Sequence, residues 1–189
     1  ILGWMYENFN AVEKVQLKES GEKIEYDKVF LQSQIYTPQW VVKFLVDNTL
    51  GKQYLEMYPD SRFMIDEEPG KTKYLIANAP KQQVRHPKEN GVLDIKLIDP
   101  ACGSGNFLIY AFSVFYDMYV DQMENYGADF SRRDIPKLIV EHNLYGVDLD
   151  ERAVQITQIA LFIKAMQLKG RRGKMPTYCN VVSSHFTLP

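Results

Sequence analysis

The chain has 189 residues, of which 46% are hydrophobic and 24% are charged, and its formal net charge is −2 at pH 7. This length is enough to bury one core with an appendage, and the composition is that of an ordinary globular protein. The near-neutral charge excludes a chain whose whole surface is built to attract nucleic acid. A local basic run occupies residues 169–174, and we interpret it as solvated cations at the end of a helix.

Cysteine usage and hydropathy exclude two further classes of protein. The two cysteines, Cys102 and Cys179, are far apart in the sequence and form no CxxC pair. We therefore expect no disulfide scaffold and no metal site, and the cytoplasm is the expected compartment. The apolar run at residues 107–119 is shorter than the roughly 20 residues that span a bilayer, so we expect no membrane association.

The N-terminal part of the chain predicts helices. Residues 1–35 contain aromatic residues at helical spacing followed by a charged stretch, which indicates two short helices. A further helix is expected with Thr37 as its N-cap, Pro38 at its first position and Gly51 at its end. Its apolar positions recur at helical spacing in two alternative sets: Trp40, Phe44 and Asn48, or Val41 and Leu45.

The rest of the chain predicts alternating strands and helices. Residues 52–93 are rich in proline and glycine and read as a connector with one strand-like run at residues 74–76. The elements expected after it are a strand at 95–98, helices at 107–119 and 135–142, a strand at 143–148, a helix between Asp150 and Gly170, and a strand near 178–182. The core side of the last helix is assigned to Val154, Ile156, Ile159, Ala160, Ile163 and Met166. This alternation predicts an α/β fold of about three parallel strands with helices on both faces.

The most informative feature is the glycine-rich run Asp-Pro-Ala-Cys-Gly-Ser-Gly at residues 99–105. It lies between a predicted strand and a predicted helix. Such a turn directs backbone N–H groups and a helix N-terminus at a ligand, and glycine lets the ligand approach the main chain. Asp99 ends the strand, and a carboxylate there favours a ligand with a cationic or polyhydroxyl part. We interpret Cys102 as a small, inert residue of the turn.

A second acid narrows the class of ligand. Asp148 ends the next predicted strand, 49 residues after Asp99, and ligands of open α/β sheets bind at the carboxyl ends of the strands. An acid in that position is suited to accept the hydroxyls of an adenosine ribose. The turn is not GxGxxG and lacks the lysine of a P-loop, which disfavours a dinucleotide or a triphosphate.

These motifs together identify a family. Residues 99–105 resemble motif I of the adenine-N6 DNA methyltransferases, Tyr-Thr-Pro at 36–38 resembles their motif X, and Tyr-Gly-Val-Asp-Leu-Asp at 145–150 resembles their motif II. The order X, I, II is that of the gamma class. Longer phrases at 34–42 with 48–51, and at 135–139 with 143–146, are similar to the large methylases of BREX phage-defence systems, with type IIG restriction–modification enzymes as close relatives. The resemblance covers most of residues 2–166 and is weakest at 52–93.

The resemblance implies a partial Rossmann-like sheet that binds S-adenosylmethionine, and it implies the site residues. Asp99 would hold the methionine ammonium of the cofactor and Asp148 the ribose hydroxyls, and Leu149 would pack on the adenine ring. The other cofactor-binding residues that it implies are Tyr36, Thr37 and Pro38 over the methionine carboxylate, Pro100, Ala101 and Gly103 in the turn, and Gly105, Asn106 and Phe107 at the helix start. The expected organisation is a helical N-terminal segment with motif X at 1–51, a connector at 52–93, and the first half of the cofactor-binding domain at 94–189.

Two departures from the family pattern affect the expected activity. Where many relatives have an acid after the third strand that binds the adenine amino group of the cofactor, this chain has Ser183, Ser184 and His185. Either Ser184 or His185 replaces that acid, or the contact is absent. The catalytic Asn/Asp-Pro-Pro-Tyr/Phe tetrapeptide is absent from the 189 residues, so no residue is assigned to catalysis. That tetrapeptide would hold a flipped-out adenine and activate its amino group.

We therefore expect an N-terminal fragment of a DNA adenine methyltransferase that is inactive alone. DNA would be contacted largely through other regions, other restriction or defence subunits are candidate partners, and self-association through an exposed sheet edge is expected. The alternatives are a fragment of an RNA or protein methyltransferase, and a non-enzymatic adaptor whose glycine-rich turn is structural.

Overall fold

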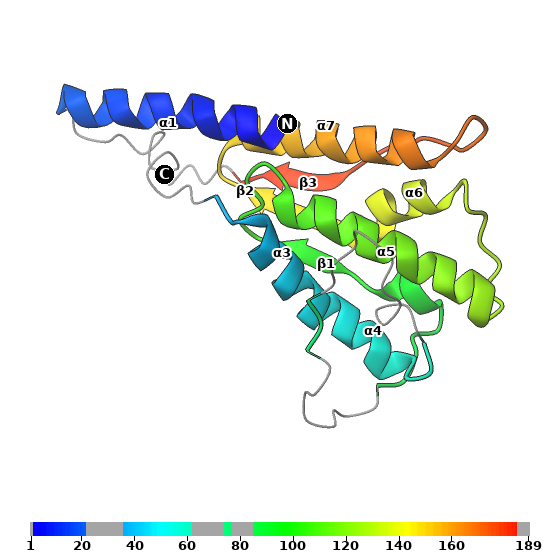
Figure 1. The fold of residues 1–189 in the computed structure, drawn as a ribbon. Helices are drawn as coiled ribbons and strands as arrows, with labels where there is room; N and C mark the ends of the chain where they lie inside the picture. The colour runs from blue at the N-terminus through cyan, green and yellow to red at the C-terminus, as the bar shows by residue number, and fades with distance from the viewer. Residues whose placement is uncertain (1, 22–35, 62–73, 77–84, 185–189) are drawn as a thin grey trace.

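The computed structural model describes residues 2–21, 36–61, 74–76 and 85–184 (Figure 1). The sheet contains three strands, β1 (Leu97–Asp99), β2 (Leu144–Asp148) and β3 (Asn180–Ser183). The main helices are α1 (Leu2–Ser20), α3 (Gln39–Val46), α4 (Lys52–Met57), α5 (Asn106–Asn125), α6 (Ile135–Leu138) and α7 (Glu151–Leu168). Short helical turns of other types are η2 (Asp47–Gly51), η3 (Gly91–Asp94) and η4 (Ile139–Asn143).

The three strands are parallel and lie in the order β1-β2-β3, which confirms the predicted α/β class. Each strand lies within two residues of its predicted position. The helices α5 and α7 contact each other and pack on the sheet face that carries Leu144, Gly146 and Val181. Gly146 allows this close approach, because a Cβ there would lie 2.9 Å from Cδ1 of Leu108 on α5.

The opposite face of the sheet differs from the prediction of helices on both faces. Ile98 and Val182 point to this face and are 65% and 55% exposed. The physical reason is topological. Both crossovers, through α5 and through α7, advance in the same direction along the sheet, and right-handed crossovers that do so place their helices on the same face. Within the described residues, this second face carries no helix layer.

The expected helix after residue 37 is longer than predicted. Gly51 does not end it, because Gly51 is buried with helical angles (φ −60°, ψ −45°) and the helical backbone continues through η2 and α4 to Met57. The expected boundary between residues 51 and 52 therefore falls inside one helical rod. Pro38, not Thr37, occupies the N-cap position, and no side chain caps this end. This one-residue shift leaves the Thr37 side chain outside the helix.

The helix is confirmed, but most of the apolar residues noted at helical spacing do not form its buried face. Trp40, Phe44 and Leu45 are exposed. The residues that pack into the core are Val42, Val46, Leu50, Tyr54 and Met57. The rod packs against α5 through α3, and a hydrogen bond from the Tyr110 hydroxyl to Oδ1 of buried Asp47 (2.8 Å) links the two helices.

Residues 74–76 do not form the predicted strand. They dock on side chains of η2 instead. The Tyr74 N–H donates to Oδ2 of Asp47 (2.8 Å), and the Ile76 N–H donates to Oδ1 of Asn48 (2.9 Å). Nδ2 of Asn48 donates back to the Tyr74 carbonyl (2.7 Å). The side chains of two helical residues thus satisfy main-chain groups that a neighbouring strand would otherwise satisfy.

Two other helices differ from their predictions. Residues 2–20 form one continuous helix, and the rest of the N-terminal stretch, residues 22–35, lies outside the described residues. On α7 the buried residues are Ala153, Val154, Thr157, Leu161 and Ala165. The predicted Ile159, Ile163 and Met166 are exposed. Gly170 (φ +66°) follows the end of α7 as expected. Within the described part of the chain, no helix is both long and apolar enough to cross a membrane.

Candidate cofactor site

The glycine-rich turn joins β1 to α5 in a backbone conformation that requires glycine. Gly103 (φ +51°) and Gly105 (φ +84°) both lie in the left-handed region, and α5 begins directly after Gly105. Thr157 on helix α7 contacts the turn at both glycines. The Thr157 hydroxyl donates to the Gly103 carbonyl (2.8 Å), and a Cβ on Gly105 would lie 2.7 Å from Cγ2 of Thr157. Both glycines therefore meet a conformational requirement, and Gly105 meets a steric one as well.

Asp99 lies at the carboxyl end of β1 with one oxygen satisfied and one not. Oδ1 accepts a hydrogen bond from the Ala101 N–H (3.2 Å), whereas Oδ2 is buried and accepts none from the described residues. Burial raises the pKa of this carboxyl above its ordinary value, and the charge of Asp148 raises it further, against the lowering effect of the Ala101 N–H. A buried carboxylate oxygen without a donor is costly, and a cationic ligand group would satisfy it.

Asp148 lies at the carboxyl end of β2 and connects that strand to the turn. Its Oδ2 accepts a hydrogen bond from the Gly103 N–H (2.7 Å), and its Oδ1 accepts one from the Asp150 N–H (2.9 Å). Asp150 is the N-cap of α7, as predicted, and accepts from the Arg152 N–H (2.9 Å). Asp148 therefore orders the turn, and its two oxygens keep further acceptor capacity for a ligand.

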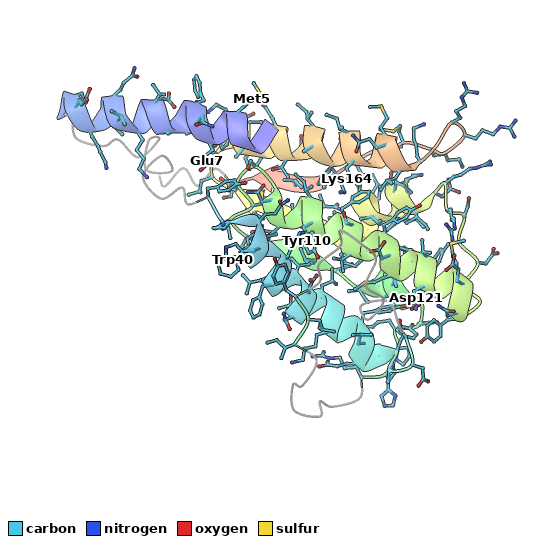
Figure 2. All side chains as sticks on the ribbon, viewed as in Figure 1. Met5, Glu7, Trp40, Tyr110, Asp121 and Lys164 are labelled. Atoms are coloured by element: carbon cyan, nitrogen blue, oxygen red, sulfur yellow. The ribbon has the colours of Figure 1, made fainter. Side chains whose placement is uncertain are left out.

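A cavity of about 240 Å³ lies over the turn. Its walls come from three segments that are far apart in the sequence: the turn with the start of α5, the residues before α3, and α1. The lining residues are Ala101, Cys102, Gly103, Ser104, Asn106, Phe107, Tyr36, Thr37, Tyr6, Glu7, Asn10, Ala11 and Lys14. Figure 2 shows Glu7 on the side of α1 that faces the rest of the molecule and Met5 on the side that faces away.

The structure brings most of the predicted site residues together. Tyr36, Thr37, Ala101, Gly103, Asn106 and Phe107 line the cavity, and Asp99 and Asp148 bind the backbone of the turn. Gly105 lies behind the turn against α7. Pro38 is the N-cap of α3, and Pro100 and Leu149 are exposed, Leu149 by 53%. None of these three lines the cavity.

Sequence reasoning missed the contribution of α1. Tyr6, Glu7, Asn10 and Lys14 line the cavity. The Tyr6 hydroxyl donates to Oδ2 of Asp150. A signal was present, because these four polar residues recur at helical spacing and so define one face of a helix.

Cys102 and the segment after β3 complete the surroundings of the turn. Cys102 is a free, buried cysteine, and burial raises the pKa of its thiol to about 12. The thiol therefore stays protonated at neutral pH, which agrees with an inert residue. The Ser184 N–H donates to the Asp148 carbonyl (2.9 Å), and His185 lies outside the described residues.

Residues 77–181 match the family model of the MmeI DNA-methyltransferase domain. The chain belongs to this family. It is 33% identical over 174 residues to the adenine-specific methyltransferase BrxX of Escherichia coli O9:H4 (strain HS), covering 88% of this chain and 13% of BrxX. It is 32% identical over 194 residues to the adenine-specific methyltransferase PglX of Lacticaseibacillus casei (strain Zhang), covering 96% of this chain and 15% of PglX. The motif-based resemblance is thereby confirmed, and the chain spans 13–15% of the length of these two relatives.

Two solved structures of restriction–modification enzymes are also similar. The first is a nuclease-deletion mutant of the type ISP enzyme LlaGI in complex with a DNA substrate mimic, with a TM-score of 0.49, 16% identity, and coverage of 84% of this chain and 10% of that one. The second is the type IIL enzyme MmeI in complex with DNA, with a TM-score of 0.35, 18% identity, and coverage of 77% and 17%.

Proposed function

We propose that this chain is the S-adenosylmethionine-binding part of a DNA adenine-N6 methyltransferase of a restriction–modification or phage-defence system. The observation that carries the proposal is the buried, unsatisfied Oδ2 of Asp99 at the start of a glycine-rich turn whose residues 101–104 line a cavity. Membership of a DNA-methyltransferase family supports a methyl donor as the ligand. The relatives BrxX and PglX, both named adenine-specific methyltransferases, support adenine as the acceptor.

The residues present fit this cofactor. Its methionine part carries an ammonium and a carboxylate, and the ammonium would supply the donor that Asp99 Oδ2 lacks. Tyr36 and Thr37, which line the same cavity as the turn, would close over the carboxylate, next to the N–H groups at the start of α5.

The adenosine part would lie over the end of β2. Asp148 would accept the ribose hydroxyls while it holds the Gly103 N–H, and exposed Leu149 would pack on the adenine ring. This role gives a reason for a large apolar side chain that is exposed directly after an acidic strand end. Pro38 and Pro100 would contribute by fixing the backbone beside the site rather than by contacting the cofactor.

We assign no covalent step to these residues. When bound, the cofactor supplies a methyl group activated by a sulfonium. The residues named above would bind the rest of the cofactor and so orient that group, and orientation is a large part of such a transfer. The 189 residues contain no Asn/Asp-Pro-Pro-Tyr/Phe tetrapeptide, so we assign none of them to hold the target adenine, and we expect the chain alone to leave DNA unmethylated.

Calorimetric titration of the 189-residue chain with S-adenosylmethionine tests the proposal. We expect binding by the wild-type chain and loss of binding by Asp99→Ala, with circular dichroism confirming that both proteins are folded. A folded wild-type chain that shows no heat of binding at millimolar cofactor would contradict the proposal. A second titration with S-adenosylhomocysteine, which lacks the methyl group, is expected to give binding as well, because the named contacts avoid the methyl.

A further inference from the structure

Helix α1 packs on the protein through polar residues and exposes four of its apolar ones. Met5, Phe9, Val12 and Val15 are 53–62% exposed. The inner face instead carries Tyr6, Glu7, Asn10, Glu13 and Lys14, which are half-buried or buried, and Asn10 is only 4% exposed. A surface helix ordinarily buries its apolar stripe, so burial of these four residues does not explain the orientation of α1.

Specific polar contacts hold α1 in this orientation. The Tyr6 hydroxyl donates to Oδ2 of Asp150, and Nη1 of Arg152 lies 3.5 Å from Oε2 of Glu13. At the start of the helix, a Cβ on Gly3 would lie 2.9 Å from the Ser104 hydroxyl, so the backbone of α1 directly approaches the turn. Because Asp150 donates to Asp148 and Asp148 binds Gly103, α1 is connected to the same groups that order the turn.

We propose that the inner face of α1, formed by Glu7, Asn10 and Lys14, binds the amino-acid end of the cofactor. The inference rests on the proposed function, since it assigns new residues to the same site. These three residues are an acid, an amide and a cation at successive positions of one helical stripe, and all three line the cavity over the turn. An α-amino acid group carries one positive and one negative charge, and such a set of side chains complements both.

The size of the cavity agrees with this assignment. Sites that enclose a whole drug-sized ligand measure roughly 300–1,000 Å³, whereas the cavity under α1 measures about 240 Å³. It therefore encloses part of the cofactor. Tyr36 and Thr37, to which the methionine carboxylate is assigned, line this cavity, whereas Asp148 and Leu149, to which the ribose and adenine are assigned, do not. Asp99 is not part of the lining either, but Ala101, whose N–H it binds, is. The part of the cofactor assigned to the cavity is therefore the amino-acid end.

Two ligands without the sulfonium charge distinguish the contact of α1 with the amino-acid end from the rest of the site. S-adenosylhomocysteine and 5′-methylthioadenosine share the adenosine and a thioether, but only the first carries the amino-acid end. We would titrate both into the wild-type chain and into Asn10→Leu and Lys14→Met. The control is Gln16→Leu, a similar polar-to-leucine change at an exposed position of the same helix.

The expected result is selective. Asn10→Leu and Lys14→Met each weaken S-adenosylhomocysteine about tenfold and leave methylthioadenosine within about twofold, while Gln16→Leu changes neither. Unchanged S-adenosylhomocysteine binding in both variants, or an equal loss of both ligands, would overturn the inference and leave the proposed function standing. A wild-type chain that binds neither ligand would overturn the proposed function first, and this inference with it.

Discussion

Asp99→Asn is the sharpest single test of the site, because it keeps the shape of the side chain and removes one acceptor. Oδ1 can keep the Ala101 N–H at 3.2 Å, while the unsatisfied Oδ2 becomes an amide nitrogen that donates. A charge-assisted hydrogen bond contributes about 1.5–3 kcal/mol, and a donor facing the cofactor's ammonium adds an unsatisfied group worth about 1–2 kcal/mol. The expected loss is about 3 kcal/mol, or roughly 100-fold in the dissociation constant of S-adenosylmethionine.

The assay is calorimetric titration near neutral pH, with Asp129→Asn as the matched control because Asp129 is exposed and distant in sequence from the turn. The control is expected to bind as the wild type does. Affinity of Asp99→Asn within about threefold of the wild type would refute the assignment of Asp99 to the ammonium.

The stability of the ligand-free Asp99→Asn variant provides a second readout. Burial raises the pKa of Asp99 in the folded chain. A raised pKa means that the stability this group contributes is present below the pKa of the unfolded chain and is lost as the pH rises through the folded value. A neutral amide carries no such loss. We therefore expect the variant to melt at or above the wild-type temperature near neutral pH, and a lower melting temperature would contradict a cost of burying the charged Asp99 carboxylate.

Three further predictions concern pH, the turn and a buried network. Because the pKa of Asp99 is raised, the affinity for the cofactor, measured by titration at stepwise lower pH, is expected to fall as Asp99 protonates. The Asp99→Asn variant is expected to lack this part of the pH dependence. The same change of affinity with pH in the wild type and in the variant would contradict the prediction. Gly105→Ala, with φ +84° and an α7 side chain 2.7 Å from the new Cβ, is expected to lower the free energy of unfolding by about 3 kcal/mol. Gly127→Ala, with φ +68° and open space around the new Cβ, is expected to lower the free energy of unfolding by about 1 kcal/mol. If urea unfolding shows the same loss of stability for both variants, crowding by α7 at Gly105 is refuted. Asn143→Ala removes a fully buried amide that accepts from Tyr119 and donates to two carbonyls, so a loss of about 3 kcal/mol is expected in the same assay, and a loss below about 1 kcal/mol would contradict it.

The amino-acid sequence alone determines the glycine-rich turn and the positions of Asp99 and Asp148 at the ends of their strands. Glycines that require φ above zero, a strand that ends in Asp99, and a second strand that ends in Asp148 are local properties, and the structure places them as predicted. Parallel pairing of β1 with β2 then brings the two acids to the same edge of the sheet, which is general for parallel strands. The family motifs could therefore be identified from the sequence alone.

Only the tertiary structure decided which face of each helix is buried. The rod from Gln39 to Met57 has apolar residues on more than one side, and α5 selects Val42 and Val46 over Trp40 and Phe44. On α7 the sheet selects Leu161 over Ile159 in the same way. Periodicity defines the stripes of a helix, but the position of the neighbour decides among them when several are apolar.

The role of α1 was also decided by the tertiary structure. Its polar inner face reaches the turn through contacts between residues about 100 or more positions apart, such as Tyr6 with Asp150 and Arg152 with Glu13. No local pattern encodes which distant residue a polar side chain will meet, because that depends on where the sheet and α7 place their ends. The sequence by itself thus determined the glycine-rich turn of the candidate site, and the tertiary structure determined that α1 lies over it.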